Sequence, residues 1–118
     1  MKGLNDIHKH IVKTTIKNKV FRNGTIDDLK IVAIDGVELF ESSEKCCENC
    51  LTRVQKDGTT HYFHRSVICV TVGSDPHIIL GQEMLEPKRD GSNKDEGEIT
   101  GGKRLIKRLY KEYHHYAD

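Results

Sequence analysis

The chain has 118 residues, of which 36% are hydrophobic, 31% are charged and 6% are aromatic, and it contains no Trp. This length provides for one domain with a thin hydrophobic core, and it excludes a multidomain organisation. The formal net charge of +1 does not by itself indicate a nucleic-acid partner, so the distribution of charge along the sequence is more informative.

Residues 1–22 form a basic segment. Its apolar residues recur at roughly helical spacing, which predicts a short amphipathic helix with a basic outer face. Polar residues interrupt this apolar series, so we expect neither a signal peptide nor a membrane span, and we expect a cytoplasmic protein. The candidates for contacts with the DNA backbone in this segment are Lys13, Lys17, Lys19 and Arg22.

The run LKIVAIDGVELF, which begins at Leu29, is rich in β-branched and aliphatic residues. This composition predicts a largely buried strand that ends in a turn or bulge, with Asp35 inside the strand or at its end. An ionised carboxylate in such a strand is costly to bury unless a metal or a positive group compensates for its charge, so Asp35 is a candidate metal ligand. The alternative interpretation is that Asp35 and Gly36 are simply a turn pair.

The next elements are predicted to be strands and then a helix. LTRV and THYFHRSVICVTVG flank the turn signal of Lys56, Asp57 and Gly58, which predicts two strands joined by a hairpin. IILGQEML is predicted to be a third strand, which ends before Pro87. From Lys103 the apolar residues fall on one helical face, which predicts a helix. Strands that precede one packed helix indicate an α/β or α+β domain.

The predicted hairpin contains cysteines and histidines at metal-binding spacing. Cys47 and Cys50 form a CxxC pair, and His61 and His64 follow on the next strand. A CxxC at a tight turn directs two thiolates to one ion and a facing strand can supply imidazole, so these four residues are candidate Zn²⁺ ligands. Strict strand alternation puts the two histidines on opposite faces, so we expect one of them rather than both to bind the ion. Cys46 could replace Cys47 or complete the set.

The alternative for clustered cysteines is burial as small hydrophobic residues. Cys69, inside the apolar run SVICVTV, is expected in the core. Without a secretory signal the four cysteines are expected to be reduced, which favours metal ligation or burial over disulfides.

The stretch IVAIDGVELFESSEKCCENC resembles the segment around the first acid of DDE-type insertion-sequence transposases. In such segments an apolar strand is followed by DG, an aromatic residue and two serines, which here are Asp35, Gly36, Phe40, Ser42 and Ser43. The similarity continues through the CxxC pair, the HYFH stretch, and DGSNKDEGE followed by GGKRLIKRL, so it covers nearly the whole chain. The order of these motifs is more specific than any one of them.

The resemblance implies a partial ribonuclease-H-like catalytic domain over residues 29–118, with the basic helical segment 1–22 before it and the Cys/His-containing hairpin at 44–66. Three antiparallel strands would begin a mixed sheet, and one helix would follow. Asp35 would be the first acidic ligand of Mg²⁺ in an enzyme that cleaves and joins phosphodiesters during DNA transposition. The second Asp and the Glu are expected after residue 118, so the chain is expected to be truncated and inactive alone.

The partners that the resemblance implies are DNA at the transposon ends and at the target, the rest of the transposase chain and, in the full-length form, a second copy. It also implies a nucleoid-associated protein of bacterial type. The sequence departs from the family at Val37 and Glu38, and at Gly101 and Gly102, where the family tends to have alanines. Each internal Gly costs a helix about 1 kcal/mol relative to Ala, which predicts that the helix effectively starts at Lys103.

Two alternatives to an active transposase are left open by the residues. One is a small zinc-binding interaction module without catalysis, which predicts stoichiometric zinc whose removal unfolds the chain. The other is a decayed, inactive copy of the element. The transposase hypothesis centres on Asp35 and makes zinc optional.

Overall fold

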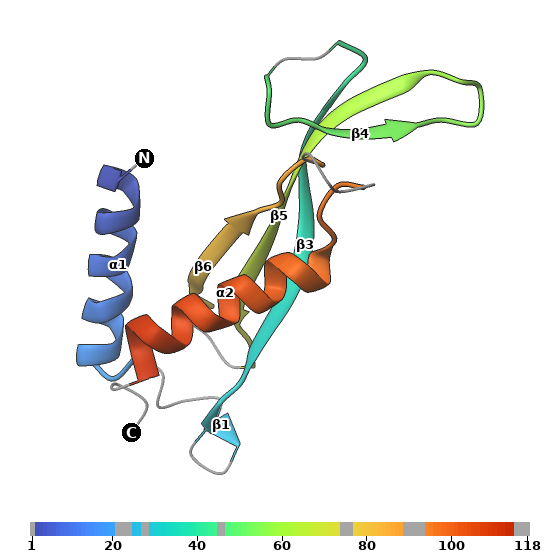
Figure 1. Ribbon diagram of the computed structural model, residues 1–118. Helices are drawn as coiled ribbons and strands as arrows, with labels where there is room; N and C mark the ends of the chain where they lie inside the picture. The colour runs from blue at the N-terminus through green and yellow to red at the C-terminus, as the bar shows by residue number, and fades with distance from the viewer. Residues whose placement is uncertain are drawn as a thin grey trace.

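One long strand, β5, organises the sheet of this computed structural model, which describes residues 2–20, 25–26, 29–44, 47–73, 77–88 and 94–114. In chain order the elements are α1 (Lys2–Lys17), β1 (Thr25–Ile26), β2 (Leu29–Lys30), β3 (Val32–Ser42), β4 (Leu51–Val54), β5 (Thr60–Thr71), β6 (Ile79–Met84) and α2 (Glu98–Tyr113) (Figure 1). β1 and β2 form a separate two-stranded sheet, and the other four strands form one antiparallel sheet. A mixed α/β domain in which antiparallel strands precede one helix is therefore confirmed, as is the helix ahead of them.

β5 has different partners on its two sides. On one side β3 pairs along almost its whole length, from Val32 opposite Thr71 to Ser42 opposite Tyr62. On the other side β4 pairs with residues 60–63 and β6 pairs with residues 66–70. β4 and β6 are thus successive neighbours of one strand, and Figure 1 shows the β4–β5 hairpin extending beyond the part of the sheet that α2 crosses. The predicted hairpin and the predicted third strand are both confirmed.

The core lies between α2 and one face of the sheet. Alternation along β5 directs Phe63, Val67 and Cys69 to the same face, and all three are buried. Leu105 of α2 is fully buried against them. The buried cluster has six members, Leu51, Phe63, Val67, Cys69, Leu85 and Leu105, which fits the thin core that the composition predicts.

α2 begins at Glu98, so the prediction that it effectively starts at Lys103 is wrong. Gly101 and Gly102 lie inside the helix and are buried. A Cβ on Gly101 would collide with the side chain of Leu85 and would lie 3.2 Å from Val67 Cγ2. The glycine therefore lets the helix backbone approach the sheet closely, and this packing offsets the lower helix propensity of Gly.

β3 is the predicted strand that differs most from its prediction. Asp35 lies inside β3, which continues to Ser42 with an irregularity in its pairing between Glu38 and Phe40. It is also largely exposed, and Leu39 retains 56% of its accessible surface. In the described part of the chain β3 pairs with β5 alone, so it is an edge strand, and an edge strand loses the neighbour that would bury its side chains.

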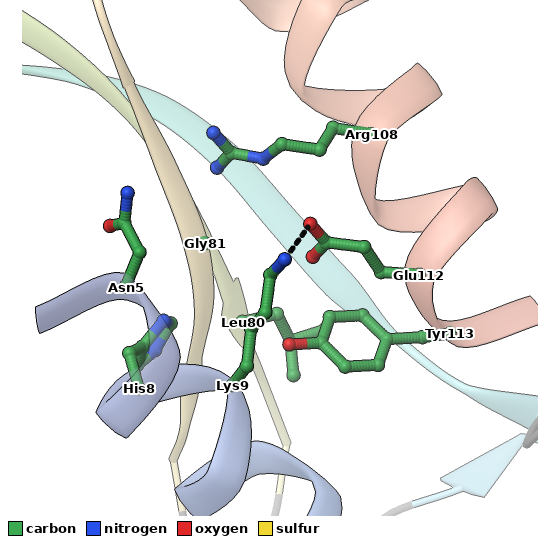
Figure 2. A pocket seen from close by; sticks show the side chains of 8 residues that line it. All are labelled: Asn5, His8, Lys9, Leu80, Gly81, Arg108, Glu112 and Tyr113. Atoms are coloured by element: carbon green, nitrogen blue, oxygen red, sulfur yellow. Dashed lines mark ion pairs between the residues drawn. The ribbon is translucent and has the colours of Figure 1, made fainter. Parts of the chain in front are cut away.

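α1 rests against β6 and the end of α2, and Figure 2 shows the side chains that meet there. Val12 is fully buried, His8 Nε2 donates to the carbonyl of Ile79 at 2.7 Å, and Lys9 Nζ lies 3.1 Å from Glu112 Oε1. His8, Lys9 and Glu112 border a small pocket of about 110 Å³. Neither described helix combines the length and the apolar character that a membrane span requires.

Candidate metal centre

Cys47 and Cys50 are brought together by a turn that leads into β4. The backbone N–H of Cys50 donates to the carbonyl of Cys47 at 3.5 Å, and the two Sγ atoms are also 3.5 Å apart. This separation is much longer than the ~2.05 Å of a disulfide, so the pair is reduced. The turn therefore holds two thiols in the arrangement that a CxxC metal knuckle uses.

His64 reaches these thiols from β5 because of the strand register. Leu51 of β4 pairs with Phe63, so the antiparallel register continued by one residue puts Cys50 opposite His64. The Nε2 atom of His64 lies 3.2 Å from Cys47 Sγ and 3.7 Å from Cys50 Sγ. In the described residues, these three side chains form the one group of His, Cys, Asp or Glu with the spacing of a metal site.

The three donor atoms fit one tetrahedral zinc ion. With Zn–S bonds of about 2.3 Å and a Zn–N bond of about 2.0 Å, two sulfurs lie about 3.8 Å apart and a sulfur and a nitrogen about 3.5 Å apart. The separations among Cys47, Cys50 and His64 differ from these values by about 0.3 Å at most. Thiolate and imidazole are also the donors that zinc prefers, whereas Mg²⁺ prefers oxygen.

His61 is not brought into this cluster. Its Nδ1 lies 2.6 Å from Glu41 Oε1. His61 and Phe63 share one face of β5, and alternation directs His64 to the other face, as the sequence indicates. Of the two candidate histidines, the geometry therefore selects His64. Cys46 lies outside the described residues, so its place in the ligand set stays open.

The cluster is buried on one side and open on the other. Cys50 retains only 3% of its accessible surface, whereas Cys47 is exposed. Cys47 and His64 line a cavity of about 510 Å³, and Cys50 is not among its lining residues. β6 and the segment after it supply most of the opposite wall, through Gln82, Glu83, Met84, Leu85, Glu86 and Pro87. The sequence contained no signal that these residues would meet the CxxC turn.

An ion-pair network holds this wall against α2. Arg104 Nε donates to Glu83 Oε2 at 2.8 Å, and its Nη1 donates to Glu96 Oε1 at 2.9 Å. Arg108 donates to the other oxygen of Glu83 and, at 2.6 Å, to the carbonyl of Gln82. The hydrogen bonds that Arg104 donates to Glu96 and Glu83 raise its pKa well above the ordinary value. The carboxylate of Glu83 therefore accepts hydrogen bonds from two guanidinium groups.

Asp35 is not among the residues that line this cavity. Gly36 faces α2, because a Cβ at that position would collide with the Glu98 side chain, and alternation then directs Asp35 to the face that α2 does not cover. The carboxylate is exposed, and its Oδ1 accepts the Gly36 N–H at 2.8 Å. In the part of the chain that is described, no cluster of acids forms around it, so its role as a Mg²⁺ ligand stays a prediction.

The remaining sequence candidates are only partly described. Lys13 and Lys17 are exposed on α1, and Lys19 is exposed just after it, whereas Arg22 lies outside the described residues. Cys69 is buried in the core as expected, and this burial raises the pKa of its thiol.

Searches among known protein families, curated proteins and solved structures found no match to this chain. Its function is therefore inferred from its residues and their arrangement.

Proposed function

We propose that this chain is the first part of a ribonuclease-H-like catalytic domain from a DDE-type transposase. The observation that carries the proposal is the order of elements around Asp35, which lies on β3 and is followed by the antiparallel strands β4, β5 and β6 and then by α2. The stretches that resemble the family fall on these elements in order, with HYFH on β5 and GGKRLIKRL on α2. The edge position of β3 is compatible with a further strand from polypeptide outside the described residues.

In this function Asp35 is the first ligand of Mg²⁺. Its carboxylate offers the hard oxygen donors that Mg²⁺ selects, and it is accessible on the face that α2 does not cover. When bound, the ions would activate the attacking oxygen and stabilise the leaving oxygen of a phosphodiester. Such a site needs several carboxylates, so we expect the chain alone to bind divalent ions weakly and to have no strand-transfer activity.

The partner in this proposal is DNA. The exposed lysines Lys13, Lys17 and Lys19 supply positive charge for phosphate contacts, which position a protein on DNA without reading its sequence. The rest of the transposase chain and a second copy are the protein partners that the proposal includes.

Paramagnetic broadening by Mn²⁺ tests the role of Asp35. Mn²⁺ replaces Mg²⁺ at carboxylate sites, and it broadens the NMR signals of nearby nuclei. We expect the amide signals of residues 34–36 to broaden first in the wild-type chain and in Glu44→Gln, which removes an exposed acid elsewhere. In Asp35→Asn this broadening should be lost. Equal broadening in all three proteins would contradict the proposed ligand.

We further propose that Cys47, Cys50 and His64 bind one Zn²⁺ ion that fastens the turn before β4 to β5. The three short separations among their donor atoms carry this second proposal. The zinc site is compatible with the transposase function. If Asp35 has no catalytic role, the zinc site instead makes the chain a zinc-binding interaction module. The site contributes stability because a bound ion favours the folded chain.

Two histidine variants give a matched test of the zinc site. His64→Asn removes a ligand, whereas His61→Asn changes a nearby histidine on the opposite face of the same strand. We expect one zinc ion per chain in the wild-type protein and in His61→Asn, measured by metal analysis after dialysis. We expect binding weakened by more than about tenfold in His64→Asn. Loss of zinc in neither variant, or in both equally, would exclude His64 as the specific ligand.

A further inference from the structure

The described ligand set leaves one position of a tetrahedral ion without a protein donor. Cys47, Cys50 and His64 supply three donors, and no fourth His, Cys, Asp or Glu in the described residues joins their group. Structural zinc sites are normally closed by four protein ligands, whereas sites that keep an exchangeable position have three. The location of the missing donor therefore decides what the site can do.

The burial of the ligands shows on which side the free position lies. Cys50 forms the buried base of the cluster, because 3% of its surface is accessible and it does not line the cavity. Cys47 and His64 both line the cavity, so an ion held by the three donors would border it. A volume of about 510 Å³ exceeds what one water molecule needs by more than tenfold. The free position thus opens onto a space large enough for a side chain or a small molecule.

Glu83, an acid that lines the cavity, is not available as a donor to the ion. Both carboxylate oxygens of Glu83 accept hydrogen bonds from guanidinium groups, one from Arg104 and one from Arg108. Moving Glu83 to the ion would break both ion pairs and leave two partly buried cations without it.

We propose that the metal bound by Cys47, Cys50 and His64 keeps an exchangeable fourth position, which takes a soft nitrogen or sulfur donor from the cavity. This inference rests on the proposed zinc site. Two thiolates and a neutral imidazole cancel the charge of a divalent ion, so the site does not attract hard anions strongly. Donors of the imidazole or thiolate class form bonds with borderline-soft zinc and fit the cavity.

Cobalt substitution tests this position. Co²⁺ occupies the same ligand sets as zinc, and its visible absorption changes when a donor is replaced. We would load the complete chain with one equivalent of Co²⁺ and titrate it with imidazole. The same titration of Cys46→Ser separates an external donor from the neighbouring cysteine. We expect a saturable shift of the visible bands in both proteins, with no loss of bound cobalt.

The remaining outcomes separate the two proposals. If cobalt binds at one equivalent but imidazole shifts the spectrum of only one protein, or of neither, the exchangeable position is overturned and the zinc site stands. A response that emerges only in Cys46→Ser would identify Cys46 as the fourth ligand. If neither zinc nor cobalt binds stoichiometrically, the zinc site and this inference both fail.

Discussion

Gly101 of α2 lies so close to Leu85 that a Cβ at position 101 would overlap the leucine side chain. Leu85 follows β6 and is buried, and its backbone N–H donates to the carbonyl of Arg65 at 2.9 Å. The hydrogen bond holds the leucine backbone in place, and burial in the core leaves its side chain little room to move away. This contact determines how closely α2 approaches the sheet.

Gly101→Ala should lower the free energy of unfolding, although alanine is the better helix former. The gain in helix propensity is at most about 1 kcal/mol, whereas overpacking a fixed core contact costs about 1–3 kcal/mol. Gly102→Ala is the matched control, because its Cβ would lie 3.8 Å from Ile34 Cγ2, an ordinary contact distance. Urea denaturation should show Gly101→Ala less stable than wild type and Gly102→Ala equal or more stable. The reverse order would contradict the close approach.

Arg104 should matter more for stability than its helical neighbour Lys103. Arg104 joins Glu83 of β6 to Glu96 and also donates to the carbonyl of Met84 at 2.9 Å, whereas Lys103 is exposed. Arg104→Gln removes the guanidinium that pairs with the partly buried carboxylate of Glu96. We expect this loss to lower the free energy of unfolding by about 1–3 kcal/mol. Lys103→Gln should change it by less than about 0.5 kcal/mol. Equal effects in thermal or urea unfolding would show that the network adds little.

The features that the sequence predicted well are local. The CxxC pair lies on a turn, the KDG signal joins two strands, and alternation along β5 separates His61 from His64. Each depends on residues within a few positions of one another, so period and turn chemistry suffice to predict it. For the same reason the sequence could limit the candidate zinc ligands on β5 to one histidine, although it did not show which of the two.

The features that the sequence did not predict depend on distant residues. β3 has the composition of a buried strand, yet its exposure depends on whether a strand lies beside it, which composition does not encode. In the sequence Gly101 indicates a weak helix, because the contact with Leu85 that favours a glycine at this position cannot be seen there. Glu83 has no local pattern that indicates its place between Arg104 and Arg108 at the cavity wall.

The ion pair between Glu38 and Arg53 should make a small, pH-dependent contribution to stability. Arg53 Nη2 donates to Glu38 Oε2 at 2.7 Å, and this hydrogen bond lowers the pKa of Glu38 below its ordinary value. A lowered folded-state pKa stabilises the fold above the unfolded pKa, near ~4.3, and this stability is lost as the pH falls through the lower folded pKa.

Glu38→Gln tests this contribution. At pH 7 it should lower the free energy of unfolding by less than about 1 kcal/mol, because the pair is largely solvated. The difference from wild type should shrink as the pH falls below about 4.3. Glu44→Gln, which removes an exposed acid, is the control substitution. A difference for Glu38→Gln that stays constant from pH 7 to acid would show that the lost charge is not its cause.

The thiols of Cys47 and Cys69 should differ sharply in reactivity, and bound metal should slow the reaction of Cys47. Burial raises the pKa of Cys69, so at a given pH it has less of the reactive thiolate, and it is also inaccessible in the folded chain. Cys47 is exposed, so only coordination to a metal would protect it. We expect iodoacetamide, followed by peptide mass mapping, to label Cys47 rapidly after chelation, slowly in zinc-loaded protein, and in both cases before Cys69. Cys69 should react only under denaturing conditions.

His64→Asn supplies the control, because Cys47 in that variant should react as fast as in chelator-treated wild-type protein, whether or not zinc is added. Protection of Cys47 by zinc in His64→Asn would mean that His64 is dispensable, and rapid labelling of Cys69 in the folded chain would mean that the core between α2 and β5 opens readily.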